Sequence, residues 1–227
     1  MPLTDAHTHR LPDPPDRLAL VDLVPGSRPE RAGDGIFFSC GIHPADADRY
    51  TLEDLRRTVE TVPVSAIGEC GLDALAPAGP DRQETVFREQ AALAEELRLP
   101  MVIHCVRKAY ELIGIRKSMR AEMPWLIHGF RGGREVAGAW LKTGCLLSLS
   151  VPWLLHLDVF PDWLPAGSFL LETDESEVPL PVIYAHAARL LQTDPDRLAE
   201  ELRKTFLRFL AGRTEQERPG TAGAGPA

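Results

Sequence analysis

The chain has 227 residues, of which 44% are hydrophobic and 26% are charged, a composition that suits one well-buried domain rather than two. Its formal net charge of −8 at pH 7 gives no overall attraction for a polyanion, so tracking along a long DNA duplex is not expected. The apolar segments fall well short of the ~20 residues needed to cross a bilayer, and prolines and acidic residues near the start are unlike a secretory signal. We therefore expect a cytoplasmic protein with no membrane contact and no stable protein partner.

Short apolar segments alternate with helical patterns along most of the chain. The segments that predict strands are residues 3–9, 18–24, 36–39, 64–67, 101–103, 125–127, 145–149 and 169–171. The clearest helix is predicted over residues 81–97, with acidic residues around its start, apolar residues at helical spacing and Pro100 just beyond its end.

This alternation predicts the fold class. It is typical of a parallel α/β sheet, and eight candidate strands favour a single, compact (β/α)8 TIM-type barrel over an open, doubly wound sheet. The segment at residues 25–35 contains too much proline and glycine for a full helix, so a missing or shortened helix is expected there. The predicted domain covers residues 1–212, and residues 213–227 are predicted to form a disordered C-terminal tail.

Side chains of the types that bind metals lie at the carboxyl ends of the predicted strands. His7 and His9 are two residues apart, so a strand presents both on the same face. Because the strand carboxyl ends of a barrel converge on one face, residues far apart in sequence are expected to meet there. The predicted metal ligands are His7, His9, Glu69, His104, His128 and Asp174.

This set predicts a site for two divalent cations. Four neutral imidazoles and two carboxylates suit zinc or manganese, with magnesium a further candidate. Two cations about 3.5–4 Å apart can activate a bridging hydroxide for hydrolysis. Glu69 is the candidate bridge and Asp174 a ligand that can also take a proton from the nucleophilic water, so both are predicted to be catalytic.

Each of these residues also has an ordinary structural interpretation. A single histidine after a strand is more often a hydrogen-bonded core or loop residue, Glu69 can cap a helix, and Asp174 can lie in a solvated acidic loop. The metal-site interpretation depends on the recurrence of such side chains at successive strand ends.

The motifs D-A-H-T-H, G-I-H-P, G-E-C-G-L-D, Q-x-x-x-F-x-x-Q, I-H-C, I-H-G-F-R-G-G and E-T-D occur in this order. This succession resembles the TatD family of metal-dependent deoxyribonucleases from residue 5 to about residue 210, most specifically at residues 68–73 and 172–174. The resemblance implies a TIM-type barrel, two divalent metals and hydrolysis of phosphodiester bonds, typically in DNA. All six predicted ligands match the family's metal ligands.

Further positions bear on substrate binding. His43 matches a family histidine close to the site, where it either contacts substrate phosphate or fixes its loop. Around Arg107 and Arg131 the chain departs from the family pattern, and each arginine is either an anchor for phosphate or carboxylate or an ordinary surface residue. The family's aromatic residues after G-L-D are replaced by residues 74–77, and residues 175–177 are acidic.

Three functions follow from these observations. The leading one is a dinuclear phosphodiesterase or deoxyribonuclease that acts on DNA ends, short oligonucleotides or small phosphodiesters. The second keeps the two metals but hydrolyses an amide, ester or lactone. The third is a binding module with a vestigial site, whose mark would be a lost ligand, and no predicted ligand is missing.

Overall fold

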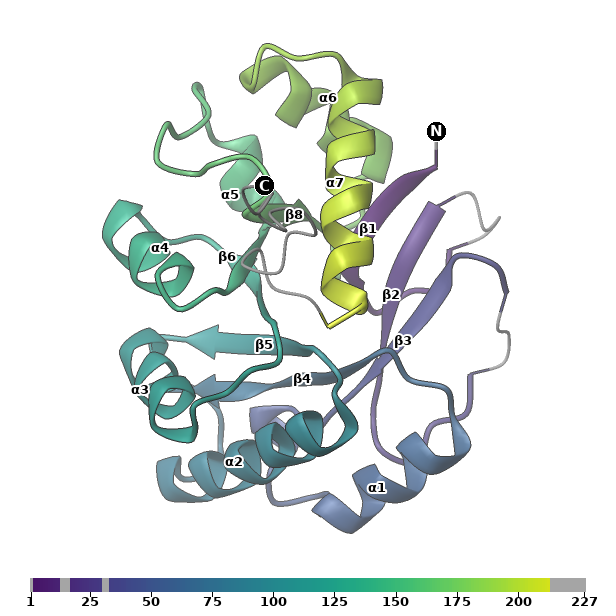
Figure 1. Cartoon of the computed structure of the whole chain (residues 1–227), viewed down its shortest axis with the longest axis vertical. Coiled ribbons are helices and arrows are strands. Elements are labelled where there is room, and N and C mark those ends of the chain that lie inside the picture. Colours follow the sequence, from purple (N-terminus) through teal and green to yellow (C-terminus); the bar gives the residue numbers. More distant parts are fainter. Residues whose placement is uncertain (1, 13–16, 30–32, 213–227) are drawn as a thin grey trace, which may run out of the picture.

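Eight parallel strands pair in the order in which they follow one another along the chain (Figure 1). The computed structural model describes residues 2–12, 17–29 and 33–212. The strands are β1 (Leu3–Thr8), β2 (Arg17–Leu23), β3 (Ile36–Cys40), β4 (Ala66–Asp73), β5 (Met101–Val106), β6 (Trp125–Phe130), β7 (Leu146–Leu149) and β8 (Phe169–Leu171). The predicted (β/α)8 barrel is thereby confirmed.

Helices follow most of these strands and lie around the outside of the barrel (Figure 1). They are α1 (Leu52–Thr61), α2 (Pro80–Leu97), α3 (Ala109–Met119), α4 (Arg134–Leu141), α5 (Val151–Leu155), α6 (Leu180–Leu190) and α7 (Pro195–Leu210), with a short 3-10 helix at Pro44–Asp46. The helix predicted over residues 81–97 is confirmed as α2, one residue longer at its start.

The barrel closes where the end of β8 meets the end of β1. Thr8 and Asp174 form a parallel β-bridge, and the backbone N–H of Asp174 donates to the carbonyl oxygen of His7 at 3.0 Å. The backbone N–H and hydroxyl of Thr173 donate to the two carboxylate oxygens of buried Asp5, each at 2.8 Å. Closure therefore holds Asp174 beside the histidines at the end of β1.

The first two connections between strands are short. Parallel neighbours usually need a crossover of about a dozen residues or more, often a helix. Only residues 9–16 join β1 to β2 and residues 24–35 join β2 to β3, and the described residues of both connections contain no helix. The helix expected to be missing near residues 25–35 is absent from the described part of that segment. The first connection is shorter still, in agreement with the predicted strands at residues 3–9 and 18–24, which leave only residues 10–17 between them.

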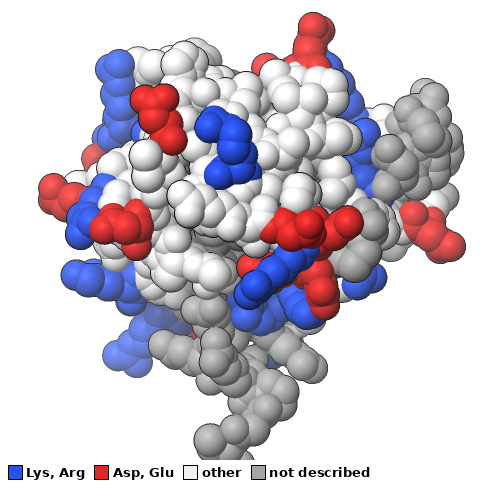
Figure 2. Space-filling model, turned by 90° about the horizontal axis from the view of Figure 1, so that it is seen from above, with Lys and Arg blue, Asp and Glu red and all other residues white. Residues whose placement is uncertain are grey.

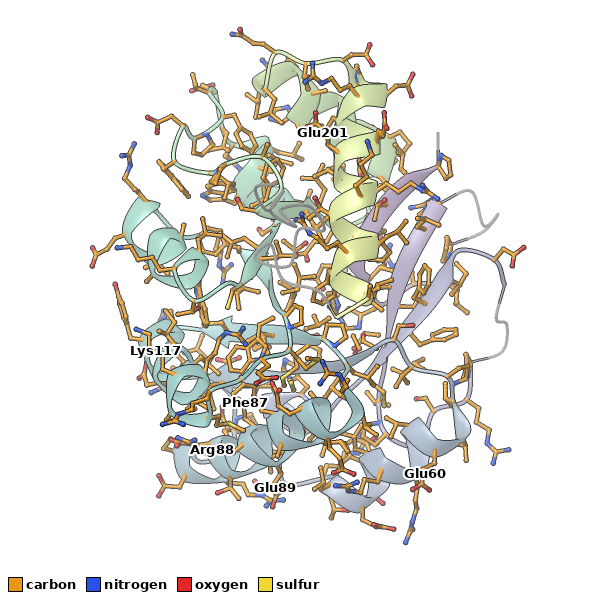
Figure 3. The ribbon with its side chains drawn as sticks, viewed as in Figure 1. Glu60, Phe87, Arg88, Glu89, Lys117 and Glu201 are labelled. Atoms are coloured by element: carbon orange, nitrogen blue, oxygen red, sulfur yellow. The ribbon has the colours of Figure 1, made fainter. Side chains whose placement is uncertain are left out.

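The packing of α2 shows how the outer helices attach to the strands. Phe87 is fully buried, and its ring lies edge-to-face on that of Trp125 in β6, with centroids 5.4 Å apart. Phe87 lies on the side of α2 that faces the strands, and Glu89 lies on the outer side (Figure 3). Burying such an aromatic side chain contributes roughly 1.5–3 kcal/mol, so this face of α2 fixes the helix against β4 and β6.

Three strands extend beyond the apolar segments that predict them. β4, β5 and β6 continue past the predicted ends, so Glu69, His104 and His128 lie within strands rather than after them. Polar side chains take the inward positions at the mouth of the barrel, so the hydrophobic pattern stops before the strand pairing does.

Two expectations are not decided by this architecture. The predicted disordered tail, residues 213–227, lies outside the described residues. Among the described helices, none is long and apolar enough to cross a membrane, and the cytoplasmic location stays a prediction.

Candidate metal centre

The six residues predicted as metal ligands lie together at the carboxyl ends of the strands. They are His7 on β1, His9 just after it, Glu69 on β4, His104 on β5, His128 on β6 and Asp174 after β8. All six appear in groups of three whose ligand atoms lie within 4.8 Å of one another. The structure thus brings the whole predicted set to one place.

The two carboxylate oxygens of Glu69 face two different pairs of histidines. Its Oε2 lies 3.4 Å from Nε2 of His7 and 3.5 Å from Nε2 of His9. Its Oε1 lies 2.5 Å from Nδ1 of His104 and 2.7 Å from Nε2 of His128. The carboxylate therefore lies between two pairs of histidines, one on each oxygen, and we call these two pairs the half-sites.

Asp174 adds a second carboxylate to the half-site of His7 and His9. Its Oδ1 lies 3.4 Å from Nε2 of His9 and 3.8 Å from Nε2 of His7. The Asp174 side chain is 39% exposed, whereas that of Glu69 is 6% exposed. Of the two carboxylates, Asp174 is the one that solvent and a substrate can reach.

Burial and neighbouring charges set the pKa values in this cluster. Burial lowers the pKa of His7 to about 4, whereas hydrogen bonds to Asp174 and Glu69 raise that of His9 to about 10. Burial opposes protonation of His128, but the charge of Glu69 outweighs it and raises the pKa to about 9. Burial would also raise the pKa of Glu69, yet His128 and His104 hold it well below its ordinary value. An ionised Glu69 thus makes the cluster attractive to positive charge.

The donor set fits divalent cations. Both ring nitrogens of buried His7 and Nδ1 of His128 lack a hydrogen-bond partner among the described residues. Buried polar atoms of this kind are uncommon and call for a partner that satisfies them. In addition, Nδ1 of His104 and Nε2 of His128 face each other at 3.2 Å, an arrangement natural for two imidazoles turned toward the same ion. Imidazole and carboxylate donors suit zinc and manganese.

A glycine in the G-E-C-G-L-D motif lets β4 approach β5 closely enough to build this cluster. A Cβ atom at Gly71 would lie 1.8 Å from the carbonyl oxygen of His104. Because such a contact is sterically impossible, any larger residue at Gly71 would push the two strands apart. The motif therefore sets the spacing between the strands that carry Glu69 and His104.

His43 lies beside the half-site of His104 and both fixes its loop and faces the centre. Its Nδ1 accepts from the backbone N–H of Ala45 at 3.1 Å, which caps the short 3-10 helix. Burial lowers the pKa of His43, so the neutral ring must carry its proton on Nε2, 3.5 Å from Oε1 of Glu69. His43 belongs, with Glu69 and His104, to one of the groups of three that could hold a metal ion, but with its proton on Nε2 the ring is a hydrogen-bond donor rather than a ligand.

Two buried glutamines of α2 hold the loops around the site. Gln90 accepts from the backbone N–H of Ile42 at 2.7 Å and donates to its carbonyl oxygen at 3.1 Å, which fixes the loop of His43. Gln83 bonds in the same way to the backbone of Asp73, at 2.8 and 3.0 Å. The Q-x-x-x-F-x-x-Q motif is thus a support for the site and not part of its chemistry.

Three buried or half-buried carboxylates around the site are not among the predicted site residues. Oδ2 of Asp73 lies 3.3 Å from Nε2 of His104, so it orients that ring with Nδ1 toward the centre. Oδ1 of Asp22, on β2, accepts from the backbone N–H of Glu69 at 2.6 Å. Glu172 accepts from the backbone N–H of Gly129 at 2.6 Å. The sequence could have pointed to Asp73, because its even spacing from Glu69 puts both on the same face of a strand. It could also have pointed to Asp22, because a charged residue inside an apolar strand is unusual.

A cleft of about 670 Å³ opens beside the centre. His104, His128 and Asp174 line one part of it, and both Arg107 and Arg131 line the same cleft. Both arginines are exposed, and within the described part of the chain neither has an ion pair or hydrogen-bond partner. The volume of the cleft is within the range of small-molecule sites.

Comparisons with known proteins agree with this architecture. The family model described as TatD related DNase matches residues 28–208. The uncharacterized metal-dependent hydrolase YcfH of Escherichia coli K12 is 33% identical over 167 residues, which are 70% of this chain and 61% of YcfH. The 3'-5' ssDNA/RNA exonuclease TatD of a Rahnella strain is 32% identical over 152 residues, 62% of this chain and 57% of that enzyme. The matched part is thus less than two thirds of either relative.

The crystal structure of YJJV, a TatD homolog from Escherichia coli, superposes with a TM-score of 0.73 and covers 91% of this chain and 97% of that chain, at 20% identity. At that identity the likeness establishes the barrel fold. The fold and the family match together place the chain among relatives that include a protein named as a metal-dependent hydrolase. More specifically, the chain belongs to the family of TatD-related proteins.

Proposed function

We propose that this chain holds two divalent cations and hydrolyses phosphodiester bonds at the ends of single-stranded nucleic acid or in short oligonucleotides. The observation that carries the proposal is the placement of Glu69, whose two oxygens face two separate pairs of histidines. His7, His9 and Asp174 would hold one cation and His104 and His128 the other, with Glu69 shared between them.

The cations and the protein residues would divide the work of hydrolysis. Two bound cations supply an activated water and neutralise charge on both sides of a displacement at phosphorus. Asp174 takes the proton of the attacking water, because it is the half-exposed carboxylate of the cluster. Partial burial would raise the pKa of Asp174, but the hydrogen bond with His9 helps to hold it below the ordinary value, so the carboxylate is ionised and can accept a proton. Glu69 is too buried to exchange protons with solvent and serves to keep the two half-sites together.

Arg107, Arg131 and His43 are the proposed contacts to the substrate. The two arginines line the cleft beside His104 and His128, and each guanidinium can donate two hydrogen bonds to a phosphate. The Nε2–H of His43 adds a neutral donor directed at the centre. A phosphate bridging these groups would lie next to the ligand cluster.

The distribution of charge favours a short substrate over a long duplex. Acidic and basic side chains are interspersed on the described part of the face shown in Figure 2, rather than gathered into one basic surface. With a net charge of −8, the chain must hold a polyanion through a few local contacts. The exonuclease name of the Rahnella relative supports the same preference for single strands.

The test is a nuclease assay on end-labelled single-stranded DNA. Chelator-stripped protein would be supplied in turn with magnesium, manganese and zinc, and a Glu69→Ala variant would run alongside to expose contaminating nuclease. We expect metal-dependent shortening from one end, released as mononucleotides, and no shortening by the variant.

Other results would overturn the proposal. Cleavage confined to internal sites of long duplex DNA would contradict the preference for ends and single strands. No cleavage with any metal, in protein shown to bind two ions, would instead favour hydrolysis of an amide, ester or lactone. The apolar side chains in the wall of the cleft, such as Phe130 and Trp140, are compatible with that chemistry.

A further inference from the structure

Tyr110 presents an exposed aromatic ring to the cleft beside the metal centre. It lies in the first turn of α3, its side chain is 56% exposed, and it lines the same cleft as His104 and His128. Its hydroxyl donates to Oε1 of Glu135, in the first turn of α4, at 3.0 Å. An exposed side chain usually samples several rotamers, but this bond ties the far end of the ring across the space between two helices.

Leu75 adds a second exposed apolar side chain to the same cleft. It is 66% exposed and lies in the connection between β4 and α2. Of the large hydrophobic side chains that are exposed in the described chain, Tyr110 and Leu75 are the two that line the cleft. Exposed apolar groups that gather at a cleft are more informative than isolated ones elsewhere on the surface.

The charged neighbours of Tyr110 leave the two arginines as the available cations of the cleft. Glu135 is occupied by the hydroxyl of Tyr110, and Glu111 is paired with Lys108 at 2.9 Å. Arg107 and Arg131 line the cleft without a partner in the described chain. The cleft thus combines an apolar ring with free positive charge, which matches a ligand that carries both an aromatic group and a phosphate.

We propose that Tyr110, held by Glu135 and assisted by Leu75, is the stacking platform for an unpaired nucleobase next to the phosphate that Arg107 and Arg131 bind. This inference rests on the proposed function and names the group that the cleft recognises. Every base has an aromatic face, so stacking tolerates different sequences. The inner base faces of a duplex are already stacked, so the platform selects a free strand end.

The experiment compares a nucleotide with the matching sugar phosphate, in which a hydroxyl group replaces the base. Binding of 2′-deoxyadenosine 5′-monophosphate and of 2-deoxyribose 5-phosphate to zinc-loaded protein would be measured by isothermal titration calorimetry. The wild-type chain is expected to prefer the nucleotide by about fivefold to 150-fold, the range that one stacked base contributes. Tyr110→Ala should lose most of this preference, with its affinity for the sugar phosphate unchanged. Tyr110→Phe keeps the ring and should retain most of the preference.

Several results would overturn the platform. They are equal binding of the two ligands by the wild type, an undiminished preference in Tyr110→Ala, or a loss in Tyr110→Phe as complete as in Tyr110→Ala. The last result would assign the effect to the hydroxyl and not to the ring. Because no bond is broken in this assay, its outcome is independent of hydrolysis. Ring-dependent binding by a chain that never shortens DNA would support the stacking platform and contradict the phosphodiesterase activity. Shortening of DNA without a preference for the base would support the phosphodiesterase activity and contradict the platform.

Discussion

The backbone N–H of Glu69 donates a hydrogen bond of 2.6 Å to Oδ1 of Asp22, a residue of β2 whose side chain is 8% exposed. The same oxygen accepts from the hydroxyl of Ser39 at 2.9 Å, and Oδ2 lies 4.0 Å from Nδ1 of His9. Asp22 therefore fixes the backbone from which Glu69 reaches both half-sites, and it faces the outer nitrogen of one proposed ligand.

Replacing Asp22 should weaken metal binding without removing a ligand. In Asp22→Ala the Glu69 N–H loses its acceptor, and we expect metal affinity to fall by about 10–100-fold, the usual effect of losing a group that orients a ligand. Asp22→Asn keeps an acceptor oxygen and should restore most of the affinity. Competition titration with a chelating dye measures both variants, and an unchanged affinity in Asp22→Ala would show that the bond does not support the centre.

Metal binding should release protons at neutral pH. Hydrogen bonds to Asp174 and Glu69 raise the pKa of His9 to about 10, and the charge of Glu69 raises that of His128 to about 9 against the effect of burial. In metal-free protein at pH 7 both rings are therefore protonated, and each must lose its proton to become a ligand. We expect release of about two protons per chain at pH 7.

The sign of the pH dependence follows from these raised values. Apparent metal affinity should increase as the pH rises from 6, and proton release should vanish above about pH 10, where both rings are already neutral. Calorimetric titrations in buffers of different ionisation enthalpy measure the number of protons. A binding enthalpy that does not vary with the buffer at pH 7 would rule out the proposed protonation states.

Loss of either cleft arginine should impair substrate binding more than turnover. Arg107→Ala and Arg131→Ala remove phosphate donors, and each is expected to raise KM by about 10- to 150-fold, which corresponds to ~1.5–3 kcal/mol for a hydrogen bond to a charged group. Arg134→Ala is the matched control, because Arg134 pairs with Asp162 at 2.7 Å and does not line the cleft. Equal effects of all three variants would show that general charge, not position, matters.

Phe87 should be important for stability. Phe87→Ala empties the space against Trp125 and is expected to lower the free energy of unfolding by about 3–5 kcal/mol. Glu89→Ala changes the exposed side of the same helix and should alter the free energy of unfolding by no more than about 0.5 kcal/mol. Urea denaturation measures both variants, and a loss below about 1 kcal/mol for Phe87→Ala would mean that α2 is not anchored through this ring.

The barrel and the ligand set could be predicted because their signals are local. Each apolar segment marks a strand, and His104 and His128 each come directly after such a segment. The convergence of the strands in a barrel is therefore enough to bring the two side chains together. The supports of the site could not be read in this way. Gln83 and Gln90 act through backbone groups far along the chain, and their roles depend on where α2 packs.

The division of Glu69 between two pairs of histidines also lies beyond sequence patterns. It depends on side-chain rotation and on the close approach of β4 and β5 at Gly71, neither of which follows from the order of residues. The short connection between β1 and β2 is implied by the predicted strands at residues 3–9 and 18–24, but hydrophobic periodicity does not say that parallel neighbours can pair across so few residues.

The most direct test of the central claim is the number of metal ions that the chain binds. Chelator-stripped protein would be dialysed against zinc, freed of excess metal and measured by inductively coupled plasma mass spectrometry, with Glu69→Ala treated in parallel. Two half-sites that share one carboxylate predict about two equivalents of zinc in the wild type and a clear loss in the variant. A wild-type chain that retains no zinc, or a Glu69→Ala variant that still holds two equivalents, would contradict the two-metal centre.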